Sequence, residues 1–114
     1  MHDPISTPPG LRVAVYAPDP GTALVSVRGE LDLATAPVLD AHLAAVRDPC
    51  VVVDLSAVDF LGVAGITVLL QHRERATAFR LVARTRVVLR PLELLGLDAV
   101  FEIHANAASA LSLG

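Results

Sequence analysis

The chain of 114 residues contains no lysine and no tryptophan, and all nine of its basic residues are arginines. Without lysine it cannot form the Gly-x-x-x-x-Gly-Lys loop that cradles nucleotide phosphates. It has three phenylalanines, one tyrosine and a net charge of −3. Because such a chain offers little aromatic surface for stacking on bases and no excess positive charge, nucleic acid is not expected as a partner.

Cysteine and long apolar segments are also scarce. The single cysteine, Cys50, excludes an intramolecular disulfide and is interpreted as a small buried hydrophobe in the reducing cytoplasm. Although 54% of the residues are hydrophobic, no apolar run approaches the roughly 18 residues that a membrane span needs. The first residues show no signal peptide. We therefore expect a cytoplasmic protein, with residues 1–10 as a flexible lead and residues 11–114 as one domain.

Catalytic groups are sparse and scattered. No cysteine or histidine pair has the spacing of metal ligands, and each of the four histidines stands alone. His42 and His72 are predicted on the exposed faces of helices, and His104 at the end of a strand. The sharpest predicted turn presents Val63 and Ala64, where a hydrolase would need a nucleophilic serine. We expect neither an enzyme nor a cofactor.

The most informative segment is residues 50–70. Three consecutive valines, Val51 to Val53, have no polar alternation, which is typical of a strand that is covered on both faces. A short acidic loop is predicted to follow at residues 56–61. Gly62 and Gly65 then precede an apolar run, which indicates a tight turn into a helix whose first amides face outward.

The rest of the chain predicts an α/β fold, with a single mixed sheet of about five strands and about four helices in the order β-β-α-β-α-β-α-β-α. The first two strands are expected to pair antiparallel. A proline at position 91 predicts a late start or a kink in the third helix. The predicted strands are residues 11–17, 23–29, 50–55, 79–83 and 100–104. The predicted helices are residues 36–47 with Thr35 as N-cap, 63–77, 86–95 with Thr85 as N-cap and Gly96 as the stop, and 107–113 with Asn106 as N-cap.

Charge is unevenly divided along the chain. Residues 1–70 hold three arginines and eight acidic residues, a balance of −5, whereas residues 71–90 hold six arginines and only Glu74, a balance of +5. The six arginines are interpreted as scattered over solvated surfaces. The alternative is an electropositive patch for an acidic partner.

Three motifs in order resemble the STAS domain, the fold of bacterial anti-sigma factor antagonists. The first is the Gly-Glu-Leu-Asp sequence of residues 29–32. The second is the segment of residues 50–70, which combines a hydrophobic strand, Asp-Leu-Ser and a glycine-bounded turn. The third is the Leu-Glu-Leu-Leu-Gly-Leu-Asp sequence of residues 92–98. The resemblance covers residues 10–113. It implies a binding module that contacts an anti-sigma factor or an ATPase-type serine kinase and so controls the availability of a sigma factor.

The turn departs from the pattern of phosphorylatable members, which the resemblance gives as Asp-Ser-Ser-Gly with the second serine as acceptor. This chain has Gly62, Val63, Ala64 and Gly65 at these places. Ala64 has no hydroxyl, so the switch residue of the family is absent. Thr67, one helical turn further, and Ser56 are the alternative hydroxyls that a kinase could use.

A second possible site lies at Asp54, Ser56 and Asp59, which the prediction places at the carboxyl end of a central strand, where open α/β sheets bind ligands. They could hold a phosphate, a nucleotide or a cation. The favoured interpretation is that Asp54 and Ser56 bond local backbone amides and shape the turn.

The resemblance implies a partner-binding surface at the end of the second strand and the turn before the second helix. Its residues are Glu30, Asp32, Gly62, Val63, Ala64, Gly65 and Thr67. An alternative is a STAS subunit of a stress-signalling scaffold or of a membrane transporter assembly, which neighbouring genes would distinguish. A homodimer remains an open possibility.

Overall fold

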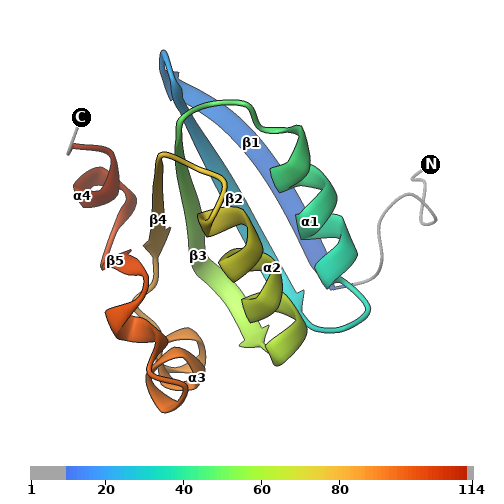
Figure 1. Cartoon of the computed structure of the whole chain (residues 1–114). Helices are drawn as coiled ribbons and strands as arrows, with labels where there is room; N and C mark the ends of the chain where they lie inside the picture. Colours follow the sequence, from blue (N-terminus) through green and yellow to red (C-terminus); the bar gives the residue numbers. More distant parts are fainter. Residues whose placement is uncertain (1–9, 113–114) are drawn as a thin grey trace.

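The computed structural model describes residues 10–112, which form a five-stranded sheet and four α-helices (Figure 1). The strands lie side by side in the order in which they occur in the chain. β1 is antiparallel to β2, and all other neighbours are parallel, so the predicted mixed sheet and the first antiparallel pair are confirmed. The strands are β1 Leu11–Asp19, β2 Thr22–Leu31, β3 Cys50–Leu61, β4 Ala78–Val82 and β5 Glu102–His104. The helices are α1 Ala36–Ala45, α2 Val63–Arg73, α3 Arg86–Leu94 and α4 Ala107–Leu111, and a 3-10 turn, η1, spans Leu97–Ala99.

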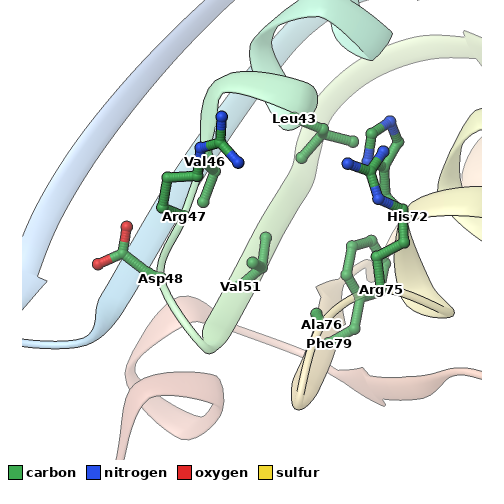
Figure 2. A pocket seen from close by; sticks show the side chains of 9 residues that line it. All are labelled: Leu43, Val46, Arg47, Asp48, Val51, His72, Arg75, Ala76 and Phe79. Atoms are coloured by element: carbon green, nitrogen blue, oxygen red, sulfur yellow. The ribbon is translucent and has the colours of Figure 1, made fainter.

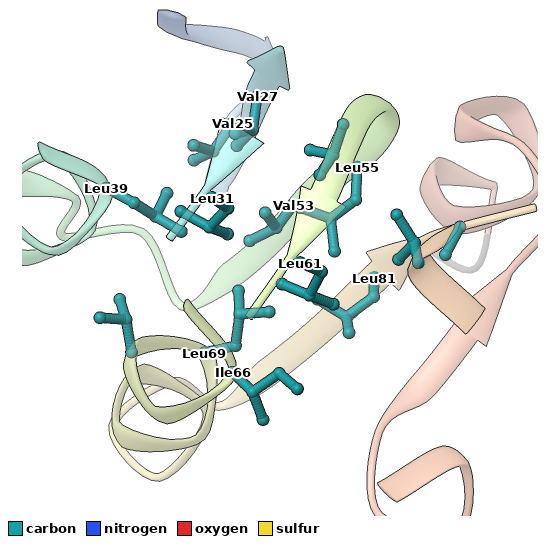
Figure 3. Packing of buried hydrophobic residues seen from close by; sticks show 14 of the residues in the cluster. Val25, Val27, Leu31, Leu39, Val53, Leu55, Leu61, Ile66, Leu69 and Leu81 are labelled. Carbon is teal, nitrogen blue, oxygen red and sulfur yellow. The ribbon is translucent and has the colours of Figure 1, made fainter. Parts of the chain in front are cut away.

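The core lies mainly between the sheet and the helices α1 and α2, which run side by side on one face (Figure 1). Figure 3 shows the inward side chains of β2 and β3 meeting those of Leu39 on α1 and Leu69 on α2. The short helix α4 covers the other face, where Ala110 packs against Val52 and Val82. The valine run of β3 is thus buried on both faces, as predicted.

The length of β3 is the largest difference from the prediction. The strand continues to Leu61, so no acidic loop follows residue 55. Its register with β2 shifts twice, between the pairs Ser26–Asp54 and Arg28–Ala57 and again between Gly29–Val58 and Glu30–Phe60. Each shift inserts one extra residue in β3, as a β-bulge does. The bulges let Leu55, Val58 and Leu61 all face the core at a spacing of three, a spacing that the rule of strict alternation does not recognise as a strand.

The helix boundaries show smaller corrections. α2 ends at Arg73 and not at residue 77, and His72 is buried instead of pointing to water. His72 lies three residues after the fully buried Leu69, on the same helical stripe, and its Nε2 is 2.7 Å from Asp40 Oδ1 of α1. The prediction followed the polarity of this side chain, whereas helical spacing places it inward.

Two predicted threonine caps occupy the expected positions without making the expected bonds. Thr35 and Thr85 precede α1 and α3, but neither side chain caps its helix. The hydroxyl of Thr85 is buried and has no hydrogen-bond partner among residues 10–112. The predicted cap of α4 is confirmed, because Asn106 Oδ1 accepts a hydrogen bond from the amide of Ser109 at 2.8 Å.

The C-terminal third follows the prediction with shifted ends. α3 begins at Arg86 and accommodates Pro91 within its length, so the helix has no late start. Gly96 ends it with a φ of 72°, which favours glycine. β5 begins at Glu102 because Val100 and Phe101 both donate backbone hydrogen bonds to Leu97 in the η1 turn. α4 ends at Leu111. Residues 1–9 of the predicted lead lie outside the described residues.

Candidate partner-binding surface

The end of β2 and the start of α2 meet in space although they are 32 residues apart in the sequence. The amide of Gly62, the residue before α2, donates a hydrogen bond to the carbonyl oxygen of Leu31, the last residue of β2, at 2.9 Å. The sequence therefore brings the Glu30–Asp32 segment and the Gly62–Thr67 segment to one corner of the sheet.

Gly65 permits this close approach. A Cβ atom at position 65 would lie 2.5 Å from Cγ of Leu31, well inside van der Waals contact. Gly65 is buried and Leu31 is inaccessible to solvent. Gly65 thus lies below the protein surface and lets α2 pack closely on β2, whereas Val63 and Thr67 are exposed.

Three large apolar side chains are exposed around this junction. Leu33 is 82% exposed, Val63 is 71% exposed and Phe60 is 50% exposed. Leu33 and Val63 lie within two residues of the Leu31–Gly62 hydrogen bond, and a Cβ atom at Gly62 would lie 3.1 Å from the Phe60 ring. We call this set the corner surface and include the neighbouring acidic residues. It consists of Glu30, Asp32, Leu33, Asp59, Phe60, Gly62, Val63, Ala64 and Thr67.

The loop that carries Leu33 is held by a reciprocal pair of hydrogen bonds. The amide of Thr35 donates to Asp32 Oδ1 at 3.0 Å, and the amide of Asp32 donates to Thr35 Oγ1 at 2.9 Å. The Thr35 hydroxyl donates in turn to the carbonyl oxygen of Glu30 at 2.7 Å. These reciprocal bonds have the pattern of a capping box, but they close the turn from Asp32 to Thr35 that precedes α1 and do not cap the helix itself. Asp32 therefore fixes the conformation of the loop that carries Leu33, through the hydrogen bond that its Oδ1 accepts from Thr35.

The two alternative hydroxyls that a kinase could use, those of Thr67 and Ser56, both donate hydrogen bonds. Thr67 Oγ1 donates to the carbonyl oxygen of Val63 at 2.9 Å, within the first turn of α2. Ser56 bonds Asp54 through its hydroxyl, and its amide donates to Asp54 Oδ1 at 2.9 Å. Ala64 itself is half-buried, and its methyl group packs against the core.

Asp54 does not lie at the end of a strand, contrary to the prediction. It lies within β3, level with Ser26 of β2 and with Val82, the last residue of β4. Its carboxylate accepts hydrogen bonds from the amide and the hydroxyl of Ser56, which lies within the first bulge. This bonding agrees with the favoured interpretation of local backbone shaping, now within a strand.

The arginines of residues 71–90 are distributed over several elements. Arg80 on β4 pairs with Glu102 at 3.0 Å, and Arg86 on α3 lies 3.5 Å from Glu93. Arg73, at the end of α2, donates to the carbonyl oxygen of Val100 at 3.1 Å. This distribution favours scattered surface charges over one basic patch.

Leu33 and Phe60 were missed as candidate surface residues. Both are hydrophobic, and residue type alone does not distinguish an exposed hydrophobic residue next to a strand from a core residue. Their positions in the sequence could have indicated that they are surface residues, because Leu33 follows the Gly-Glu-Leu-Asp motif and Phe60 lies just before the glycine turn. Asp59 was considered only as part of a ligand site.

A cavity of about 210 Å³ lies at the opposite end of the helices (Figure 2). It adjoins the amino ends of β3 and β4, near Val51 and Phe79, whereas parallel α/β sheets bind ligands at the carboxyl ends of their strands. Its remaining lining residues are Leu43, Val46, Arg47, Asp48, His72, Arg75 and Ala76.

Two further features bear on possible functions. Within residues 10–112, no three histidine, cysteine, aspartate or glutamate side chains are grouped so that they could hold a metal ion. None of the helices in this part of the chain has the length and apolar character that crossing a bilayer requires.

Comparison with known proteins gives the family. The STAS domain model matches residues 15–110. Anti-sigma-F factor antagonist RsfB of Mycobacterium tuberculosis is 37% identical over 114 residues, with 95% of this chain and 93% of RsfB covered. A crystal structure of an anti-sigma factor antagonist from Mycobacterium paratuberculosis has a TM-score of 0.87 at 38% identity and covers 94% of this chain and 96% of its own. The unphosphorylated form of SpoIIAA shares the fold, with a TM-score of 0.73 at 15% identity over 90% of this chain and 95% of its own. The chain belongs to the STAS domain family.

Proposed function

We propose that this chain is an anti-sigma factor antagonist, a non-catalytic binding module of the cytoplasm. It binds an anti-sigma factor, or a serine kinase of the ATPase type with that role, and thereby releases a sigma factor. The mycobacterial relatives that cover nearly the whole chain carry the name of this activity. The observation that carries the proposal is the exposure of Leu33, Phe60 and Val63 at the junction of β2 and α2.

The corner surface has the chemistry of a protein-binding site. Monomeric proteins seldom gather large exposed apolar side chains unless these bind a partner. Glu30 and Asp59 add negative charge beside the apolar group, so the matching surface of the partner is expected to be basic around an apolar centre. Val63 stands at the first position of α2, where it can enter a pocket of the partner.

Ala64 makes this binding independent of phosphorylation at the usual place. A phosphoryl group would add nearly two negative charges to the corner surface, and an alanine cannot accept one. The Thr67 hydroxyl donates to the carbonyl oxygen of Val63 and the Ser56 hydroxyl donates to Asp54, so phosphorylation of either would first break its hydrogen bond. Regulation then rests on expression of the chain or on modification of the partner.

The test begins with a pull-down from the native host that identifies the anti-sigma factor. Calorimetric titration of that protein into the chain, with and without ATP, measures the affinity. We expect a one-to-one complex that survives incubation with ATP. Absence of binding to any anti-sigma factor of the host would contradict the proposal, and capture of a transporter component instead would favour the assembly-subunit alternative.

A further inference from the structure

The strand β1 forms one edge of the sheet and leaves its outer side unpaired within residues 10–112. It is nine residues long, whereas β5 at the other edge has three. Proteins usually protect edge strands by keeping them short or by placing charges or prolines in them. The segment from Val13 to Ala17 has none of these protections and contains β-branched and aromatic residues. Such an edge is suited to pairing with another strand.

The backbone groups available at this edge can be assigned from the pairing with β2. The amide of Glu30 donates to the carbonyl oxygen of Gly10, and the register continues with Leu11 opposite Gly29. Hydrogen-bonded and non-hydrogen-bonded pairs alternate along antiparallel strands. The amides and carbonyls of Leu11, Val13 and Val15 therefore point away from β2, towards the open edge.

The side chains of β1 divide between two faces. Leu11 and Val13 belong to the core on the helix side, and Val15, which is 46% exposed, lines an open groove with Ala41, Ala45 and Val46 of the α1 region. On the other face, Tyr16 is 56% exposed and Arg12 has no ion pair among the described residues. An apolar groove thus runs beside the unpaired edge.

We propose that two copies of the chain pair their β1 strands antiparallel about a two-fold axis at Ala14, so that their sheets become continuous. In this register Val13 of each copy lies opposite Val15 of the other and exchanges backbone hydrogen bonds with it. Arg12 lies opposite Tyr16 of the other copy, on the face away from the helices, where a guanidinium and an aromatic ring attract each other.

Charge and strand geometry select this register and this occupant. An axis at Arg12 would place two arginines directly opposite each other, which is destabilising. An axis at Val13 would oppose Arg12 to Ala14 and lose the Arg12–Tyr16 pair. An axis at Val15 would extend the pairing to residues 18 and 19, where the register of β1 shifts. The axis at Ala14 uses the regular part of β1. It forms the Arg12–Tyr16 pair and the Val13–Val15 pair on each side of the axis, as an isologous interface between identical chains requires.

The dimer is independent of the proposed function. It uses β1 and the adjoining side of α1, whereas Phe60 and Val63 of the corner surface lie on β3 and α2. The assembly would carry two corner surfaces.

Sedimentation velocity over a range of micromolar concentrations tests the dimer directly. We expect a species of twice the 12.0 kDa chain mass. Val15→Arg should abolish this species, because it places a charge in the groove beside α1, opposite the apolar Val13 of the other copy. Leu94→Arg, at a residue of α3 that is 71% exposed, is the matched control and should remain dimeric.

A cross-link tests the register. In a Cys50→Ser background, Ala14→Cys brings two thiols to the two-fold axis, where opposed residues of a non-hydrogen-bonded pair have Cα atoms about 4.5 Å apart. Mild oxidation should join the copies. Ala17→Cys should remain unjoined, because its two copies would lie about 20 Å apart at roughly 3.4 Å per residue. A monomer at all concentrations would overturn the proposal and would leave the edge of β1 to a strand of another protein. A dimer that persists in Val15→Arg would also overturn it, because the copies would then associate through another face.

Discussion

Leu31 and Gly62 are joined by a hydrogen bond of 2.9 Å between the carbonyl oxygen of the first and the amide of the second. This bond fixes the start of α2 against the end of β2. The exposed side chains of Leu33, Phe60 and Val63 are placed around it, so the shape of the corner surface depends on this contact.

The close packing of Gly65 against Leu31 predicts that a methyl group at position 65 strongly lowers the stability of the fold. Gly65→Ala should lower the free energy of unfolding by about 1–3 kcal/mol, since the new Cβ would lie 2.5 Å from Leu31 and α2 must shift. Urea denaturation measures the change. Gly62→Ala is the matched control and should cost much less, because its Cβ would lie 3.1 Å from the exposed Phe60 ring and in ordinary contact, 3.7 Å, with the Leu31 carbonyl oxygen. Equal stabilities of Gly65→Ala and the parent would show that α2 does not pack as described.

Val63→Asp should weaken binding of the anti-sigma factor at least about tenfold, or about 1.4 kcal/mol. The variant removes an exposed apolar contact and adds charge to an already acidic corner. Because Val63 is a surface residue, the free energy of unfolding should change by no more than about 0.5 kcal/mol. Leu94→Asp is a control of equal exposure, 71%, on another helix. If calorimetry finds that both variants, or neither, bind more weakly than the parent, the binding site does not include Val63.

Ala64→Ser should restore the missing switch. The serine would stand at the second position of α2, half-buried beside the corner surface. If the partner is a serine kinase of the ATPase type, we expect it to phosphorylate Ala64→Ser in the presence of ATP and then to release it. Mass spectrometry detects the phosphoryl group. Phosphate on the parent chain at Thr67 or Ser56 would contradict the proposal that binding by this chain is free of phosphoryl control.

The stability of the C-terminal part should depend on pH through Glu102. The hydrogen bond from His104, together with the charge of Arg80, lowers the pKa of Glu102 below its usual value. A carboxylate with a lowered pKa stabilises the folded state above the ordinary carboxylate range, and this stabilisation is lost as pH falls through the lowered pKa.

Glu102→Gln should accordingly reduce stability at neutral pH, by less than about 1 kcal/mol because the side chain is half-exposed. The difference from the parent should shrink in acid. Thermal unfolding at several pH values measures it, with Glu74→Gln at the end of α2 as control. A deficit that stays constant down to acid pH would rule out this role of Glu102.

The sequence predicted the order of elements, the mixed sheet and the position of the α2 turn because these follow from local patterns. The valine run at Val51 to Val53 and the glycines at 62 and 65 are such patterns. The continuation of β3 to Leu61 was missed, because two bulges give its inward residues a spacing of three and strict alternation does not recognise it.

The corner surface could be predicted from the sequence only in part. Glu30, Asp32 and Val63 are candidates that the resemblance implies and stay predictions, whereas exposed hydrophobic residues such as Leu33 and Phe60 cannot be told from core residues by type. Their exposure depends on how the ends of β2 and β3 emerge from the sheet. The burial of His72 and its contact with Asp40 depend likewise on how α1 packs against α2, which the local pattern does not contain.

The central claim is that the corner surface binds an anti-sigma factor without phosphoryl control of this chain. The most direct measurement is the affinity of the purified anti-sigma factor for the chain after incubation of both with ATP, with the intact mass of the chain determined from the same sample. We predict unchanged mass and undiminished affinity, with binding lost in Val63→Asp. A phosphoryl group on the chain together with loss of binding would contradict the account.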